Sequence, residues 1–513
     1  MGMAPSQVFL PRQENQTLGI AQFAIDFLGD GFASPDPAVL RKVEQFHLDS
    51  IACAVAAIGC GTNAPCVLRE EAMEYAVVGI PVTGLPAPGA SLFGSTMLVK
   101  PEKAVLANCA AVRELDANGT NFGFNAATGD TRGEFGHNDF YPVVLAAAQQ
   151  TGADGRRTLL GMLCLDEIRG RLAEVFALKD HKIDHVVHGA IASAAVYGAM
   201  LGASAAQIES AIGLVLAHYI PFRAIRAGHQ LSDSKGASAA ISAEMAVVSV
   251  QRARRGFVGP ADVFRNPQAV FCLFEPPENT NESPFDLALS TSGCDFAVMG
   301  MHFKLGLYEH QSAGAIQGLI DVLGADPGLL DSVDQLERVR ITIYEPAFSI
   351  IGDPAKRDPR TRQSADHSMV YIIATLLRKA VQTRQVGWRE LMLVPDDYND
   401  ESLFDPITRQ LMARIEFVHG GRPYDQQYPD GIPTTLEITH RQLGTCSSGL
   451  VMYPAGHARN RGADLDGLLD AKCRRLADYG VCDAGALIER FSDFETKTST
   501  HIRQLYDFQL DAH

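Results

Sequence analysis

Three polar side chains that could take part in proton transfer or substrate binding, Asp116, Thr120 and His137, lie in one glycine-rich stretch. This stretch, ELDANGTNFGFNAATGDTRGEFGHNDFYP (residues 114–142), interrupts apolar, alanine-rich sequence on both sides. Glycine permits tight backbone paths, and polar loops held by rigid elements often carry function. We therefore predict that the loop breaks a helical core to bring Asp116 and His137 to the mouth of a cleft.

A second group of polar residues, His181, His185 and His188, follows in KDHKIDHVVHGA at spacings that share one helix face. Three imidazoles this close could bind a metal ion, but no neighbouring carboxylate on the same face is evident. A cluster at a helix start that faces a polar pocket is the favoured interpretation, because histidine can serve as acid or base near neutral pH.

Two lysines stand in otherwise apolar surroundings. Lys235 opens an apolar helix in LSDSKGASAA, and Lys304 lies in MGMHFKLGLYEHQ, shortly before His310. A lone lysine beside apolar residues most often extends its ammonium group to solvent. Two such lysines together with the loop histidines favour a pocket for an anion. Because the net charge of the chain is −16, an anionic substrate must be held by such a local cationic cluster.

The composition excludes several classes of protein. A net charge of −16 argues against a nucleic-acid-binding face, and no apolar run is long enough to predict a membrane span. Ten scattered cysteines without a signal peptide indicate reduced thiols and a cytoplasmic protein. The chain has no phosphate-binding loop, nucleophile elbow or zinc-binding histidine motif.

The pattern along the chain predicts a mainly α protein, a large all-α helical domain with an inserted smaller α+β lid domain. Residues 20 to 290 are mostly helical in pattern, and RVRITIYE, ARIEFVHGG and TTLEITHRQ alternate as half-buried strands do. The sequence turns helical again after AGHARN. We therefore expect a helical domain over 1–296, the lid domain over 297–452, and a helical C-terminus over 453–513 that returns to the first domain.

Several helix ends are marked by their residue types. Asp36 and Pro37 predict a helix start, and Ser204 and Gln207 have capping-box spacing after a break near Gly202. Gly256 follows a basic helix end, as a C-terminus prefers.

Seven short segments in collinear order resemble the MmgE/PrpD family. ADHSMVY and YPAGH are the most specific, and the others are LDANGT, GHND, DHVV, SKGA and HFK. The resemblance runs from about residue 20 to about residue 490. It implies a helical domain with an inserted α+β lid, which agrees with the layout above.

The resemblance also implies an activity. The family includes 2-methylcitrate dehydratase, so we expect a cytoplasmic hydro-lyase that dehydrates 2-methylcitrate, or a close tricarboxylate, in the methylcitrate cycle of propionate metabolism. The alternatives are a cis-aconitate decarboxylase or a dicarboxylate epimerase of the same family, because all three reactions remove a proton next to a carboxylate. A binding homologue without activity is disfavoured, since every charged family position holds a compatible residue.

The family's site positions fall on eight residues of this sequence. Two departures concern the substrate: the spacer between Thr120 and His137 is longer than usual, and the segment after Lys304 is shorter. By resemblance the catalytic residues are His137, His185, Asp116 and Lys304, and the substrate-binding residues are Thr120, Lys235, Tyr344 and His310.

The chemistry of dehydration assigns roles to these residues. Removing a C–H proton beside a carboxylate and expelling a hydroxyl requires a base, an acid and fixed positive charge. We expect His137 and His185 to be the proton-transfer pair, Lys235 and Lys304 to hold carboxylates, and Asp116 to orient a cation. No metal or other cofactor is expected, because iron–sulfur and zinc spacings are missing. The resemblance further implies a homodimer through the helical domain.

Overall fold

A computed structural model describes most of the 513-residue chain. The described residues are 6–78, 87–125, 130–131, 133, 135–226, 231–352 and 354–511, with the backbone alone described for residues 125, 130 and 131. Twenty α-helices, α1 to α20, are present among them, and the strands form small sheets. The predicted mainly α class is confirmed.

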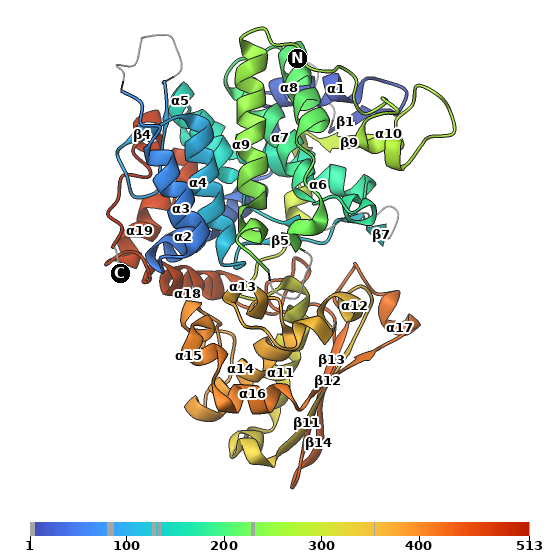
Figure 1. The fold of residues 1–513 in the computed structure, drawn as a ribbon, viewed down its shortest axis with the longest axis vertical. Helices are drawn as coiled ribbons and strands as arrows, with labels where there is room; N and C mark the ends of the chain where they lie inside the picture. The colour runs from blue at the N-terminus through green and yellow to red at the C-terminus, as the bar shows by residue number, and fades with distance from the viewer. Residues whose placement is uncertain are drawn as a thin grey trace.

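Helices from the first half of the chain form one bundle, the upper part of Figure 1. Its centre is built around α9, which packs against α4 on one side and α7 on another through alanine-rich faces. Small side chains let helices approach closely, so alanine here serves packing. The bundle contains α1 (Gln16–Phe27), α2 (Pro37–Gly59), α3 (Asn63–Met73), α4 (Pro101–Glu114), α5 (Tyr141–Thr151), α6 (Gly155–Val175), α7 (Val186–Met200), α8 (Ala205–His218), α9 (Ser234–Arg254) and α10 (Val270–Phe274).

Local signals set several of these boundaries as predicted. Pro37 is the first residue of α2, although the Asp36 side chain makes no capping bond. The Ser204 side chain accepts from the Gln207 amide, and both halves of the capping box are present at the start of α8. Gly202 separates α7 from α8 with φ of 71°, in the left-handed region that glycine adopts without strain.

A four-stranded sheet with its own helices lies below the bundle in Figure 1. The strand order is β12-β11-β13-β14; β11 pairs parallel with β12, and the other pairs are antiparallel. Helix α11 packs on β13 and β14, and Gly314 permits this approach because a Cβ there would lie 2.4 Å from Thr434 Oγ1. The bounds are α11 (Ala313–Ala325), β11 (Leu336–Ile343), α12 (Ala347–Ile351), α13 (Arg362–Ala365), α14 (Met369–Thr383), α15 (Asp400–Leu403), α16 (Pro406–Met412), β12 (Ile415–His419), α17 (Arg422–Asp425), β13 (Thr434–His440) and β14 (Gly444–Val451).

The end of the chain lies beside the bundle (Figure 1). Helix α18 (Leu465–Ala477) packs on α2 and is followed by α19 (Ala484–Phe491) and α20 (Ser499–Arg503). The remaining strands form two-stranded pairs: β1 (Gln7–Leu10) with β9 (Leu287–Ser290), β2 (Ser34–Pro35) with β10 (Ser292–Gly293), β3 (Ala90–Ser91) with β4 (Leu98–Val99), β5 (Thr120–Asn121) with β8 (Phe135–Gly136), and β6 (Phe124–Asn125) with β7 (Asp130–Thr131).

In the described part of the chain, no helix on its own has both the length and the apolar character to cross a membrane. Helices α2 and α3 together meet that criterion by length and composition, but the chain bends by 90° between them.

Candidate active site

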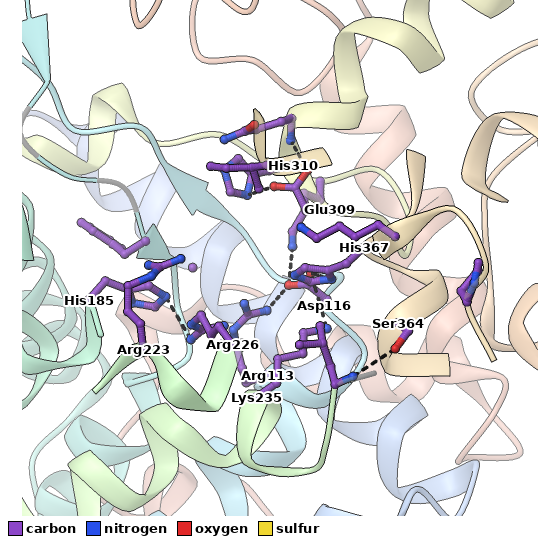
Figure 2. A pocket seen from close by; sticks show the side chains of 18 of the residues that line it. Arg113, Asp116, His185, Arg223, Arg226, Lys235, Glu309, His310, Ser364 and His367 are labelled. Carbon is purple, nitrogen blue, oxygen red and sulfur yellow. Dashed lines mark hydrogen bonds and ion pairs between the residues drawn. The ribbon is translucent and has the colours of Figure 1, made fainter. Parts of the chain in front are cut away.

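A pocket opens where α4, α9 and the start of α7 meet segments 304–311 and 350–367 (Figure 2). Six lysine and arginine side chains line it, against the acidic residues Asp116 and Glu309. This cationic excess, on a chain of net charge −16, fits a ligand that carries several negative charges. The six are Arg113, Arg223, Arg226, Lys235, Lys304 and Lys356.

Asp116 lies at the centre of the charged side chains (Figure 2). It follows the end of α4 with φ of 51°, a left-handed conformation that aspartate tolerates better than most residues. Its carboxylate contacts the Arg113 guanidinium, Lys304 Nζ at 2.8 Å and Lys235 Nζ at 3.8 Å. Burial opposes ionisation, but the charges of Arg113, Lys304 and Lys235 outweigh it and hold the pKa of Asp116 well below its usual range. The side chain is therefore a permanent anion and a weak base.

Two features bring the cations to Asp116. One is the close approach of α9 to the end of α4, and the other is a β-bridge. Gly236 of α9 lies against the end of α4, since a Cβ there would lie 2.5 Å from Glu114 Oε2. This contact places Lys235 beside the end of α4. His302 and Thr120 exchange backbone hydrogen bonds of 2.8 and 2.9 Å, which fixes Lys304 two residues further on.

His367 is paired with a carboxylate beside the pocket. Its Nδ1 lies 2.6 Å from Asp366 Oδ1, which Lys235 Nζ also contacts at 2.9 Å. Burial and then the charge of Lys235 lower the pKa of His367 to about 4, so the ring is neutral at physiological pH. A neutral ring that donates from Nδ1 carries its lone pair on Nε2. His367 therefore has the tautomer of a general base.

His185, the residue before α7, lies on another wall of the pocket. Arg226 Nη2 is 3.2 Å from His185 Nε2, and the guanidinium also contacts Asp184. Burial lowers the pKa of His185 well below its usual range and Arg226 lowers it further, while Asp184 acts in the opposite direction. The imidazole is thus neutral, and its Nε2 lone pair accepts from Arg226.

Contacts across the pocket hold the segment around α13 against the bundle. The Leu231 amide donates to Ser364 Oγ at 3.0 Å. Arg362 Nη1 donates to the Glu114 carbonyl at 3.0 Å, and the same guanidinium pairs with the Glu114 carboxylate. Residues from both parts of the chain therefore complete one site.

The structure brings five of the eight predicted site residues to the pocket, namely Asp116, His185, Lys235, Lys304 and His310. Thr120 lines a smaller adjacent cavity, and its hydroxyl donates to the Phe135 carbonyl at 3.1 Å. Tyr344 follows β11 and stacks on Tyr428 with 4.6 Å between ring centres, outside the residues that line the pocket.

His137 is not brought to the cleft, contrary to the loop prediction. The side chain is fully buried, with Nε2 2.8 Å from Asp166 Oδ1, and Asp166 also accepts from the Tyr141 hydroxyl at 2.6 Å. Its ring packs edge-on against Phe46 at 4.2 Å. The predicted proton-transfer pair is therefore separated, because the loop turns His137 into the core while Asp116 faces the pocket. Of the glycine-rich insert, residues 126–129, 132 and 134 lie outside the described part.

Sequence reasoning missed several residues of the pocket, among them His367, Lys356 and three arginines. His367 stands in the quoted ADHSMVY segment, where the neighbouring acidic residue was an available signal. Arg113 precedes Asp116 by one helical turn, a spacing that favours ion pairs. Arg223 and Arg226 lie in a short 3-10 helix (Arg223–Arg226) that no periodicity indicates.

The three histidines near residue 185 do not converge on one point. His181 contacts Glu275 at 3.1 Å, whereas His188 is buried in α7. Among the described residues, the one group at metal-ligand spacing is Asp116, Asp366 and His367. Lys304 and Lys235 already contact its carboxylates.

A chain of buried charges runs from the pocket into the core. Asp139 Oδ2 lies 3.8 Å from Arg113 Nε, and Asp139 Oδ1 accepts from Arg169 Nη1 at 2.7 Å. The Arg169 guanidinium contacts the rings of Phe135 and Phe140, 4.2 and 4.6 Å from their centres. Asp139 therefore links two guanidinium groups. One is that of Arg113, which contacts Asp116, and the other is that of Arg169, which contacts two aromatic rings.

Replacing Asp139 by asparagine should lower the free energy of unfolding by about 3–5 kcal/mol, because Arg169 would remain buried without its counter-charge. Chemical denaturation measures this loss. Asp331→Asn, which breaks the exposed pair with Arg384, is the matched control and should cost less than about 1 kcal/mol. Equal effects of the two substitutions would show that the buried charges add no more stability than an exposed ion pair.

The chain is similar to proteins of one family over most of its length. Sequence profiles of the MmgE/PrpD N-terminal and C-terminal domains match residues 20–282 and 308–491. The mitochondrial 2-methylcitrate dehydratase of Yarrowia lipolytica is 26% identical over 449 residues, covering 83% of this chain and 79% of that protein. The 2-methylcitrate dehydratase of Cupriavidus necator is 25% identical over 457 residues, 83% of this chain and 84% of that protein. That of Salmonella typhimurium is 23% identical over 433 residues, 82% and 83% of the two chains.

Proposed function

Because the chain belongs to the MmgE/PrpD family, as its motifs predicted, we propose that it is a hydro-lyase that dehydrates a tricarboxylate. The favoured substrate is 2-methylcitrate, which would be converted to 2-methyl-cis-aconitate in propionate metabolism. The names of the relatives support this choice, and so does the pocket.

The observation that carries the proposal is the charge of the pocket. Six lysine and arginine side chains face two carboxylates in a site that is partly withdrawn from water. A substrate with three carboxylates supplies the missing negative charge. Lys235, Arg226 and Lys356 lie on different walls, so they can hold carboxylates that point in different directions.

We assign the base to His367. Its Nε2 lone pair takes the proton from the carbon next to a carboxylate, and the C–H electron pair forms the new double bond. A bound polyanion offsets the charge of Lys235, which raises the low pKa of His367 toward the range of an effective base. Asp366 fixes the ring and stabilises its protonated form.

The acid is assigned to Lys304. Burial lowers its pKa, with Asp116 acting in the opposite direction, so its ammonium gives up a proton more readily than that of an exposed lysine. The C–O bond breaks, the hydroxyl takes the Lys304 proton, and water leaves. Asp116 holds Lys304 in place, which is the orienting role predicted for it.

We further propose that residues 297–452 act as a lid domain on a helical domain formed by 1–296 and 453–513. Lys304, His310 and His367 belong to this lid, whereas Asp116 and Lys235 belong to the helical domain. Closure of the lid then brings the acid, the base and the cationic side chains together around the substrate. The homodimer remains a prediction of the resemblance, and the cytoplasmic location remains a prediction from the scattered cysteines.

An ultraviolet assay for the conjugated double bond tests the function. We expect absorbance to rise with 2-methylcitrate, and less with citrate or isocitrate, and the rate to be unchanged by EDTA. Carbon dioxide release from cis-aconitate without that signal would instead identify a decarboxylase. Loss of activity on chelation, restored by a divalent ion, would show that a metal takes part.

A further inference from the structure

A small chamber lies directly behind Lys304 and His310, which line both it and the main pocket. Its other walls include Thr120, Phe122, His302 and His457. It has room for about one water-sized group. A whole carboxylate therefore does not fit, but a single hydroxyl does.

Two stacked histidines, His302 and His457, form one wall, with 4.1 Å between ring centres and 31° between planes. The Nδ1 atom of His302 accepts from the Ala458 amide at 2.9 Å, and that of His457 accepts from the Arg459 amide at 3.2 Å. Since a neutral imidazole has one acceptor and one donor nitrogen, these bonds place the hydrogen of each ring on Nε2. Both rings are therefore N–H donors on their other side.

The His457 donor has no acceptor among the residues that the structure describes. His457 is 5% exposed, and its Nε2 makes no hydrogen bond with any described residue. A buried donor without an acceptor costs free energy that a ligand oxygen recovers. A ligand oxygen in the chamber would give His457 the acceptor that it lacks among the described residues.

The charges of the side chains around the chamber indicate which kind of ligand oxygen it suits. Burial and then Arg459 lower the pKa of His457 to about 3, and burial and then His457 hold the pKa of His302 well below its usual range. Both rings are neutral, and Lys304 is the one lysine or arginine on the described walls. The chamber therefore suits an uncharged oxygen better than a carboxylate.

We propose that the chamber receives the leaving hydroxyl of the substrate, with His457 Nε2–H donating a hydrogen bond to its oxygen. The inference rests on the dehydration proposed above. Lys304 lines both cavities, so its proton reaches the hydroxyl as the C–O bond breaks, and the chamber then holds the water that forms. The hydrogen bond from His457 keeps the hydroxyl directed away from the lysine and arginine side chains that hold the substrate carboxylates.

The test compares a ligand that has the hydroxyl with one that lacks it. In His457→Phe, which keeps the stacked ring, kcat/KM for 2-methylcitrate should fall roughly 10- to 100-fold. The Kd of tricarballylate, a tricarboxylate without a hydroxyl, should change less than twofold. His457→Gln keeps an N–H donor and should recover part of the loss.

His440→Phe is the matched control. His440 is buried, its Nδ1 accepts backbone amides from Gln442 and Leu443 at 3.2 Å, and its Nε2 makes no bond with a described residue. It lines neither cavity, however, so this variant should behave as wild type with both ligands.

Two other outcomes overturn the inference. Equal weakening of 2-methylcitrate and tricarballylate in His457→Phe would show a general packing role. A selective loss of the preference for 2-methylcitrate over citrate would show that the chamber holds the methyl group. If the wild type binds citrate but does not turn it over, the dehydratase proposal fails while the chamber can still be tested. The ratio of citrate to tricarballylate affinity in His457→Phe then decides whether the chamber holds the hydroxyl.

Discussion

Replacing His367 by alanine should lower kcat roughly 10²- to 10⁴-fold, because the variant loses the group that removes the substrate proton. KM should change little, since the carboxylates are held by lysine and arginine side chains. Steady-state kinetics with 2-methylcitrate measures both constants. His419→Ala, which removes another histidine paired with a carboxylate but outside the pocket, is the control and should retain wild-type kcat.

The competing assignment places the base on His185, the predicted proton-transfer residue that does line the pocket. If His185 only positions Arg226, His185→Ala should raise KM more than it lowers kcat. A near-normal kcat for His367→Ala together with a collapse for His185→Ala would transfer the base role to His185.

The second large effect is expected for Lys304→Met, which keeps the unbranched stem and removes the ammonium group. Without the acid, kcat should fall roughly 10²- to 10⁴-fold. The pH profile of kcat/KM supplies a separate signature. Activity needs neutral His367 and protonated Lys304, so the wild-type profile should decline below about pH 4 and again at high pH. Because the Lys304 pKa is lowered, the alkaline decline should begin below that of an exposed lysine.

Lys304→Met should abolish this alkaline decline and leave the acid one. Lys379→Met is a fair control, since Lys379 also contacts a carboxylate, Asp397 at 2.6 Å, but lies outside the pocket. An unchanged alkaline limb in Lys304→Met would mean that another group, with His310 as the next candidate, protonates the hydroxyl.

Much of the fold could be predicted because the signals are local. The capping box at Ser204 and the glycine before it fix the break between α7 and α8. Strands β11, β12 and β13 alternate apolar and polar residues, and the structure contains all three. Strand β14 was not predicted, because its residues are mostly exposed and β13 supplies its pairing. The pairing of β1 with β9 joins segments that local sequence patterns cannot relate.

The site was harder to predict than the fold, because residue type does not determine which way a loop side chain points. Asp116 and His137 flank the same glycine-rich segment, yet one faces the cations and the other faces Asp166 in α6. Lys235 and Lys304 could be predicted, since a lysine in apolar surroundings needs an anionic partner or solvent. The role of His367 depends on Lys235 and Asp366 together, a contact that only the folded chain creates.

The ion pairs around Asp116 have a consequence for how ligands enter. The Asp116 carboxylate serves as an internal counterion for Arg113 and Lys304. Binding is therefore an exchange reaction in which the incoming anion shares these cations with a resident one. A ligand with fewer carboxylates completes less of that exchange, whatever its shape. Selectivity among organic acids should accordingly follow the number of ionised groups first and their carbon skeleton second.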